Sequence, residues 1–209
     1  MQYKILKLVV GMLQENCFIV FDENKDAFIV DPGGSVEEII KSINENKLNI
    51  NFILLTHGHA DHIGAVAKLK QKYNAPVYLS EKDRDFLENP EKVRSSSFGL
   101  KVDKTKVDYV VKNGDVINFS EDKIKVIETP GHTLGSVCYL FKNFLFAGDT
   151  LFAGSIGRTD FPESDHSLMI KSLNKLKELD DEIYVLSGHG PESELGQEKI
   201  TNPFLSRIW

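Results

Sequence analysis

The order of apolar runs and turn signals constrains the fold of this chain more than any other feature of its sequence. The first half predicts three strands, a helix, a strand, a helix and a strand, at residues 3–10, 16–21, 26–31, 36–46, 51–55, 63–73 and 76–79. The second half predicts five strands, a helix, a strand and a short helix, at 107–111, 115–119, 123–128, 136–141, 144–148, 165–178, 182–187 and 193–200. Strand clusters that alternate with helices in two similar halves predict a four-layer αββα sandwich of the α/β class.

The segments between these elements contain no linker-like or low-complexity stretch. Residues 81–106 are polar and mixed, which predicts a short helix and a loop covering one face rather than a separate domain. Ser35 is a predicted N-cap for the helix at 36–46. A chain of 209 residues is long enough for one large domain and short for two. We therefore predict a single domain over residues 1–209.

The charge and hydropathy of the chain limit its partners. The net charge is -6, and a surface with that balance repels phosphate backbones, so we expect a small-molecule substrate rather than nucleic acid. No run approaches the roughly 18 apolar residues that a membrane span needs, so no membrane partner is expected. Residues 1–7 lack the basic-then-apolar layout of a secretory signal, which favours the cytoplasm. The oligomeric state is left open.

The two cysteines are not predicted to carry chemistry. Cys17 and Cys138 both lie inside apolar runs that are typical of strands. This setting favours packed, reduced thiols over a disulfide or a reactive site.

A histidine-rich segment directly after the predicted strand at 51–55 is the clearest sign of chemistry. It reads Thr-His-Gly-His-Ala-Asp-His-Ile-Gly over residues 56–64 and holds His57, His59, Asp61 and His62. The small residues between these side chains allow a tight loop on which they can converge. Imidazole and carboxylate groups are ligands for zinc and iron, so the segment predicts a metal site rather than a merely solvated loop.

Three further corners place a ligand-type residue beside a glycine after an apolar strand. They hold His132 after 123–128, Asp149 after 144–148 and His189 after 182–187. Each corner taken singly is more typical of a turn. Together with the histidine-rich segment, the set is hard to ascribe to chance.

These motifs resemble the metallo-β-lactamase superfamily of hydrolases, and within it the short, glyoxalase II-like thioesterase branch. The likeness spans nearly the whole chain, and residues 56–64 with Gly148-Asp149-Thr150 are its most specific parts. The resemblance implies the αββα fold. It also implies a first metal ion held by His57, His59 and His132, a second held by Asp61, His62 and His189, and a bridge between them by Asp149.

The implied site is catalytic, because seven ligands leave two ions with open coordination positions. Two metal ions can lower the pKa of a shared water toward ~7 and so supply a bridging hydroxide as nucleophile. We expect two zinc ions, with iron or manganese as alternatives, and catalytic roles for Asp61 and Asp149. The implied reaction is hydrolysis of S-(2-hydroxyacyl)glutathione or a related thioester.

Three residues near the motifs receive other roles. Asp31, in a turn that resembles the family's turn after the third strand, is expected to hydrogen-bond the metal loop rather than bind metal. His166 lies at a predicted helix start and is expected to cap the helix or lie on the surface. Arg158 stands where glyoxalase II carries a lysine that contacts glutathione, so it is predicted to bind a substrate carboxylate. The alternative is a surface arginine paired with Asp160.

Two departures from glyoxalase II weaken the glutathione assignment. Asp160 replaces a tyrosine of that family, and the chain is expected to lack its C-terminal helical domain. The main alternative is a mononuclear iron persulfide dioxygenase of the same superfamily, which shares the Gly-Arg-Thr-Asp-Phe turn at 157–161. An electron-transfer scaffold, a nuclease and a β-lactamase are less favoured.

Overall fold

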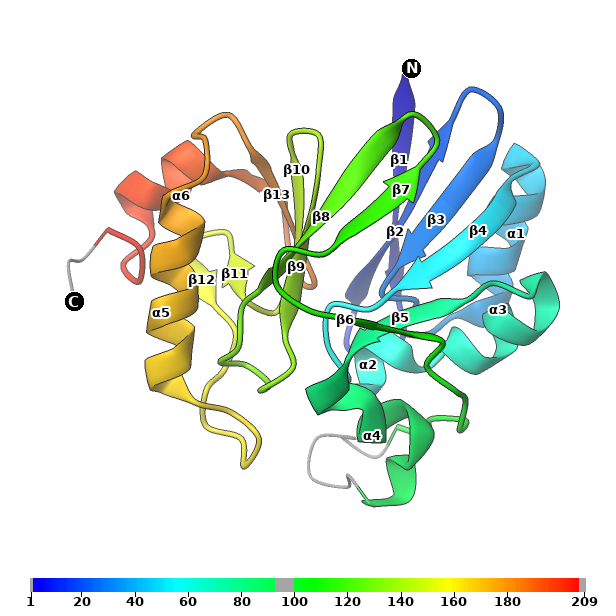
Figure 1. Cartoon of the computed structure of the whole chain (residues 1–209), viewed down its shortest axis with the longest axis horizontal. Coiled ribbons are helices and arrows are strands. Elements are labelled where there is room, and N and C mark those ends of the chain that lie inside the picture. Colours follow the sequence, from blue (N-terminus) through cyan, green and yellow to red (C-terminus); the bar gives the residue numbers. More distant parts are fainter. Residues whose placement is uncertain (1, 93–99, 207–209) are drawn as a thin grey trace. The chain divides into compact units, whose positions relative to one another are not determined.

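The structure, a computed structural model, describes residues 2–92 and 100–206. Contacts divide the chain into two compact units, 1–110 and 111–209, each with a sheet of its own (Figure 1). The single domain expected over 1–209 stays a prediction. Residues 93–99 of the segment at 81–106 lie outside the described residues.

The sheet of unit 1 has six strands in the order β1-β2-β3-β4-β5-β6. Their bounds are β1 Tyr3–Val10, β2 Glu15–Asp22, β3 Asp26–Val30, β4 Asn49–Leu54, β5 Val77–Ser80 and β6 Tyr109–Val111. The β1-β2-β3 pairs are antiparallel, whereas β3-β4 and β4-β5 are parallel. The parallel pairs arise because helices α1 (Val36–Asn46) and α3 (Val66–Tyr73) connect the strands.

In the core of unit 1, the apolar side chains of the strands, which repeat every two residues, pack against those of the helices, which repeat every 3.6 residues. Ile39 and Ile43 of α1 and Leu69 of α3 are at most 1% exposed, and they belong to one cluster with Ile29 and Ile53 of the sheet. Figure 1 shows α1 and α3 beside the same sheet. This packing fixes the strands whose ends carry the histidine-rich loop.

The sheet of unit 2 has the strand order β14-β13-β10-β9-β8-β7. Its elements are β7 Val116–Phe119, β8 Asp122–Glu128, β9 Val137–Phe141, β10 Phe144–Gly148, β13 Tyr184–Ser187 and β14 Ser193–Glu194. Helices α5 (His166–Lys177) and α6 (Leu195–Thr201) belong to this unit, as does a separate hairpin of β11 (Leu151–Phe152) and β12 (Ser155–Ile156). Leu145 and Val185 of the sheet are fully buried in one cluster with Met169 and Leu173 of α5.

The structure departs from the local predictions in the following places. The helix expected at 63–73 is two helices, α2 (Ala60–Ile63) and α3. Ser35 occupies the N-cap of α1, but its side chain makes no capping hydrogen bond, because its φ of 44° is left-handed and its Oγ accepts from the Gly11 N–H at 3.2 Å. The hairpin β11–β12 was not predicted.

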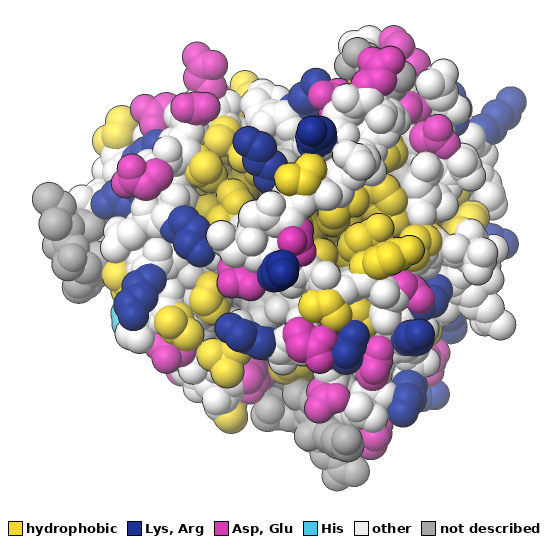
Figure 2. Space-filling model, in the orientation of Figure 1, with side chains coloured by type: hydrophobic (Ala, Val, Ile, Leu, Met, Phe, Trp, Pro, Cys, Tyr) yellow, Lys and Arg dark blue, Asp and Glu magenta, His cyan; other side chains and the backbone are white. Residues whose placement is uncertain are grey.

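The segment at 81–92 is helical, as expected. It holds the short elements η1 (Glu81–Asp83), α4 (Arg84–Glu88) and η2 (Pro90–Lys92). On the face shown in Figure 2, acidic and basic side chains are interspersed. None of the helices within 2–92 and 100–206 has the length and apolar character needed to cross a membrane.

Both cysteines are free and buried, which confirms the prediction of packed, reduced thiols. Burial raises the pKa of the Cys17 thiol well above its ordinary value, and the nearby Glu15 and Asp31 carboxylates raise it further. A thiol in that setting is a poor nucleophile.

Candidate metal centre

The carboxyl ends of β3 and β4 begin the site in unit 1. These strands are parallel, with Val30 beside Leu54, so the residues that follow them meet at one edge of the sheet. Asp31 there accepts hydrogen bonds from the Thr56 N–H at 2.7 Å and the Thr56 hydroxyl at 2.5 Å. Asp31 therefore fixes the start of the histidine-rich loop, as expected from the sequence.

The four predicted ligands of unit 1 lie together. Their relative exposures are 1% for His57, 2% for His59, 9% for Asp61 and 0% for His62. The ring centroid of His57 is 4.8 Å from that of His59 and 4.1 Å from that of His62. His59 is the N-cap of α2, whose first turn carries Asp61 and His62. The short helix thus brings the His62 ring beside His57 and places Asp61 Oδ2 3.9 Å from His62 Nε2.

Hydrogen bonds behind the rings orient two of these histidines. Asp31 Oδ2 lies 3.0 Å from His62 Nδ1, and Thr56 Oγ1 lies 3.1 Å from His57 Nδ1. Because the Thr56 hydroxyl donates to Asp31, it accepts from His57, so Nδ1 carries the proton in both rings. A metal-binding histidine is held in the same way, which leaves Nε2 as the donor atom.

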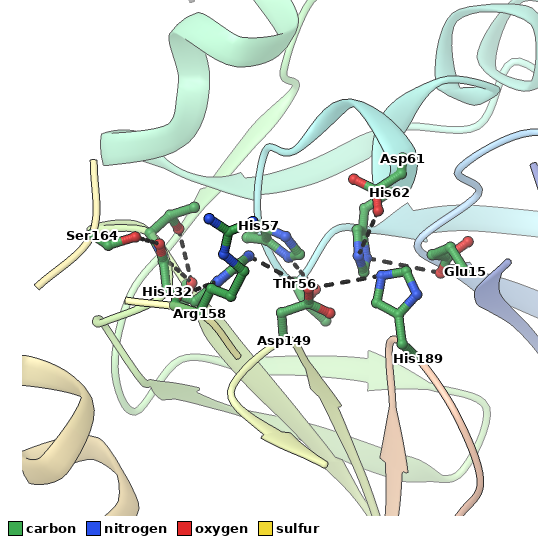
Figure 3. A network of polar contacts seen from close by, with 12 residues as sticks. Glu15, Thr56, His57, Asp61, His62, His132, Asp149, Arg158, Ser164 and His189 are labelled. Atoms are coloured by element: carbon green, nitrogen blue, oxygen red, sulfur yellow. Dashed lines mark hydrogen bonds and ion pairs between the residues drawn. The ribbon is translucent and has the colours of Figure 1, made fainter. Parts of the chain in front are cut away.

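Two buried carboxylates of unit 1 were missed by sequence reasoning. Glu15, which begins β2, is 0% exposed, and its Oε1 lies 3.8 Å from His62 Nδ1 (Figure 3). Asp83 of η1 is 1% exposed and accepts a hydrogen bond from the Gly58 N–H at 2.9 Å. The only sequence signal for Glu15 is a polar residue at the start of an apolar strand. Asp83 gives none.

Gly58 lies between the first two histidines and packs against α4. A Cβ at this position would lie 2.6 Å from Phe86 Cβ, so the loop can approach the helix this closely only with a glycine at position 58. The Phe86 ring also meets the His59 ring edge-on, at a centroid distance of 5.7 Å. Helix α4 thus supports the loop from its outer side.

The predicted ligands of unit 2 also lie at a common edge. Parallel pairing of β10 with β13 sets Gly148 beside Ser187, so Asp149 and His189 emerge close together. Asp149 Oδ2 lies 3.4 Å from His132 Nε2 and 3.8 Å from His189 Nε2. Donors bound to one zinc ion at ~2.1 Å in a tetrahedron are about 3.4 Å apart. The distances therefore suit a carboxylate that shares metal ions with both histidines.

His132 is oriented from behind as well. Its Nδ1 lies 2.8 Å from the carbonyl oxygen of Arg158, which can only accept, so Nδ1 carries the proton and Nε2 faces Asp149. The Ser164 hydroxyl donates to the His132 carbonyl at 2.6 Å (Figure 3). Imidazole nitrogens and carboxylates with these hydrogen bonds fit divalent zinc or iron.

Arg158 makes the pairing that was considered as the alternative to substrate binding. Its Nε and Nη2 each donate to Asp160 at 2.8 Å, and its guanidinium lies 4.4 Å from the Phe161 ring centroid. The hydrogen bond raises the pKa of Arg158 and lowers that of Asp160. The Arg158 side chain is exposed. Its role toward a substrate stays a prediction.

His166 is confirmed as a surface residue. It is the first residue of α5 and is exposed, and its Nδ1 contacts the Thr159 hydroxyl at 3.0 Å. Asp165, not His166, caps the helix, because its side chain accepts from the Leu168 N–H. Hydrogen bonds from Ser167 and Leu168 lower the pKa of Asp165.

The family match covers most of the chain. The metallo-β-lactamase superfamily matches residues 10–189, a range that includes all seven predicted ligands. The chain belongs to the metallo-β-lactamase superfamily. Membership and the histidine-rich ligand sets together make it a metallo-hydrolase of that superfamily.

Individual relatives match over nearly the full length. Hydroxyacylglutathione hydrolase GloC of Haemophilus influenzae is 40% identical over 204 residues, which cover 94% of this chain and 95% of that protein. The structure of the BLEG-1 B3 metallo-β-lactamase has a TM-score of 0.92 at 38% identity, covering 98% of this chain and all of that one. TTHA1623, solved in a di-iron-bound form, has a TM-score of 0.85 at 34% identity, covering 96% of this chain and all of that one. The predicted fold class, the αββα sandwich of metallo-β-lactamases, is confirmed.

Proposed function

We propose that this protein is a dinuclear metal-dependent thioesterase that hydrolyses S-(2-hydroxyacyl)glutathione or a related thioester. The observation that carries the substrate class is the full-length similarity to the hydroxyacylglutathione hydrolase of Haemophilus influenzae. The orientation of the histidine rings supports the metal-dependent part of the proposal, since three of them have Nδ1 engaged behind the ring. The reaction adds one water across the C–S bond and yields a carboxylate and a thiol.

The ligand residues divide into two sets in this proposal. His57, His59 and His132 would hold one ion, and Asp61, His62 and His189 the other, with Asp149 serving both. When bound, the two ions would activate a water at neutral pH and polarise the thioester carbonyl. The Asp61 and Asp149 carboxylates would accept hydrogen bonds from that water and so keep a lone pair of its oxygen directed at the carbonyl carbon. No serine or cysteine nucleophile is needed.

The proposed metal is zinc, and iron is the strongest alternative because TTHA1623 is known in a di-iron-bound form. Manganese is the third candidate metal. A small-molecule substrate and a cytoplasmic location are part of the proposal. The two free, buried cysteines suit a reducing compartment.

A second candidate function is β-lactam hydrolysis. It is favoured by the 38% identity to a protein named as a B3 metallo-β-lactamase. The same ligand sets could serve either acyl group, so substrate preference has to be measured rather than inferred from the donors. A mononuclear iron persulfide dioxygenase is the third candidate, and it differs in consuming oxygen.

One set of parallel assays separates these functions. The zinc-loaded and iron-loaded proteins are assayed for S-lactoylglutathione hydrolysis, for hydrolysis of a β-lactam and for oxygen uptake with glutathione persulfide. We expect thioester hydrolysis to have the largest kcat/KM by at least about a hundredfold. Oxygen uptake at a higher kcat/KM, or a preference for the β-lactam, would overturn the proposal. The His132→Ala variant controls for contaminating thioesterase.

A further inference from the structure

The hairpin β11–β12 is connected to the proposed metal ligands of unit 2 in three ways. Its first strand begins two residues after Asp149. The Phe152 ring meets the His189 ring edge-on, with centroids 6.2 Å apart. The Arg158 carbonyl, two residues beyond the hairpin, accepts from His132 Nδ1 at 2.8 Å. The position of this hairpin therefore affects three ligands at once.

Gly157 joins the hairpin to Arg158, and its backbone is tightly packed against its neighbours. A Cβ on Gly157 would lie 1.8 Å from the Asp149 carbonyl oxygen and 3.2 Å from His132 Nδ1. Backbone packed this closely transmits a small displacement directly to its neighbours. A shift of the hairpin should therefore turn the His132 ring.

The hairpin cannot hold this position by itself. Each strand has only two residues, and isolated hairpins of this kind are marginal in water. Two side chains from the C-terminal end of unit 2 hold it. Glu198 Oε2 accepts from the Gly154 N–H at 2.8 Å, and Asn202 Nδ2 donates to the carbonyls of Phe152 at 3.2 Å and Ser155 at 3.0 Å.

Both of these polar side chains are buried. Glu198 in α6 (Figure 1) is 3% exposed, and Asn202, directly after that helix, is 0% exposed. They also bind each other, through Asn202 Nδ2 and Glu198 Oε2 at 2.8 Å. Asn202 Oδ1 accepts from the Phe204 N–H at 3.0 Å. Because burying polar groups is costly unless they are paired, such a network specifies one arrangement of helix and hairpin.

We infer that Glu198 and Asn202 are positioning residues, which latch the hairpin so that the Arg158 carbonyl holds the His132 ring with Nε2 toward the metal. The inference rests on the metal-binding part of the proposed function. Neither residue touches the proposed ligands. They act through Gly154, Phe152 and Ser155, and the chain from there carries the effect to Gly157 and Arg158.

An isosteric substitution tests the latch. Asn202→Asp keeps the acceptor for the Phe204 N–H but turns an oxygen toward the Phe152, Ser155 and Glu198 oxygens. We expect zinc affinity, measured by competition with a chromophoric chelator, to fall about tenfold, the lower end of the range for residues that support metal ligands. Glu198→Ala should act similarly. Glu198→Gln should retain most of the affinity, because its amide oxygen still accepts from the Gly154 N–H.

Lys199→Ala is a matched control in the same helix. Lys199 Nζ donates to the Leu179 carbonyl at 2.5 Å and to Asp181 at 2.6 Å, so its removal loosens α6 without touching the hairpin. We expect a lower Tm with unchanged zinc affinity. If Lys199→Ala weakens zinc as much as Asn202→Asp at a similar loss of Tm, the effect is only general destabilisation and the latch is refuted.

A second readout needs neither metal nor substrate. In metal-free wild type, histidine nitrogen NMR should show a protonated Nδ1 for His132, and the Gly154 amide should exchange slowly with solvent. Both signatures should be lost in Asn202→Asp and kept in Lys199→Ala. If the wild-type protein binds no zinc, the proposed function is rejected. The NMR and amide-exchange signals still test the latch in that case. Unchanged signals in Asn202→Asp would overturn the latch alone.

Discussion

Asp149 lies near two proposed histidine ligands of unit 2, His132 and His189, at 3.4 and 3.8 Å. A side chain that serves both ions should be more sensitive than one that serves a single ion. We expect Asp149→Ala to lose most of one metal equivalent and to lower kcat more than any single histidine substitution. Metal analysis and steady-state rates check this. Asp165→Ala removes the half-buried carboxylate that caps α5, and it should change neither quantity. Retention of both metals and a near-normal kcat by Asp149→Ala would show that Asp149 does not bridge.

Arg158 provides a second test at the scale of single residues, because two donors of its guanidinium group already bind Asp160. If Arg158 binds a substrate carboxylate, Asp160 competes for the same donors. Arg158→Ala should then raise KM for a charged thioester roughly tenfold or more, with metal content intact. Arg158→Lys should recover part of the loss.

Asp160→Asn supplies the opposite change at the same site. It removes the negative charge and one of the two oxygens that bind the guanidinium, and it should lower KM for the charged thioester. A neutral thioester without a carboxylate is the internal control for both variants. Equal effects on charged and neutral substrates would mean that Arg158 shapes its loop and does not contact the substrate.

The proposed ligands could be predicted from the sequence because each follows an apolar strand and belongs to a specific motif. Asp31 could be predicted for the same reason. Glu15 and Asp83 could not, because they reach the histidine-rich loop from distant positions, and a single buried carboxylate has no periodic signal. The conformation of Ser35 was also hidden, since a serine before an amphipathic helix normally caps it.

At the scale of elements, α4 and η1 support the histidine-rich loop through Asp83 and Phe86. Asp83→Ala leaves the buried Gly58 N–H without its acceptor, which should cost about 1–3 kcal/mol of unfolding free energy. We expect weaker metal binding as well, by about tenfold. Asp83→Asn should recover most of both, since its amide oxygen can accept.

Asp85→Ala is the matched control for this prediction. Asp85 is exposed on α4, and its side chain accepts from Asn89 on the same segment. Its removal should leave metal affinity unchanged. Urea unfolding and chelator competition give the two quantities. A loss of stability in Asp83→Ala with wild-type metal affinity would show that the support is not relayed to the histidines.

The interaction of Asp108 with Lys70 and with β5 can be tested by changing the pH. It accepts from Lys70 Nζ at 2.5 Å and from the Val77 N–H at 2.8 Å. Burial raises the pKa of Asp108, but the hydrogen bonds from Lys70 and Val77 and the charges of Lys70 and Lys106 lower it overall. The stabilisation is therefore present above the unfolded pKa of about 4 and is lost as pH falls through the lower, folded value.

Asp108→Asn should accordingly cost about 1 kcal/mol of unfolding free energy at pH 7 and little once both proteins are below the folded pKa of Asp108. Urea unfolding of both proteins from pH 7 down to the lowest pH at which they remain folded measures the difference. Asp26→Asn, in the same unit, is a control for removing one negative charge. An equal cost of Asp108→Asn at every pH would mean that the ion pair contributes nothing.

Element order was largely predictable, because apolar periodicity and turn signals record it directly. The long strands and helices α1 and α5 have the expected positions to within about two residues. The hairpin β11–β12 was not predicted, because two-residue strands leave no periodic pattern. The division of residues 60–73 into α2 and α3 was hidden as well, since the apolar pattern continues through it.

At the scale of the whole molecule, fold class followed from two repeats of strands and helices, and family membership followed from the motifs. Substrate identity does not follow in this way. The ligand sets are common to a superfamily with several chemistries, and Arg158 and Asp160 depart from the glyoxalase II pattern. Those positions are where specificity has to be measured.

The main expectation is that the seven proposed ligands, which come from both halves of the chain, together hold two catalytic metal ions. Elemental analysis of protein prepared with zinc and then dialysed tests it most directly. We expect close to two ions per chain, loss of thioester hydrolysis when a chelator removes them, and recovery on adding zinc back. A reproducible content of one iron per chain, with oxygen consumed during turnover, would contradict it.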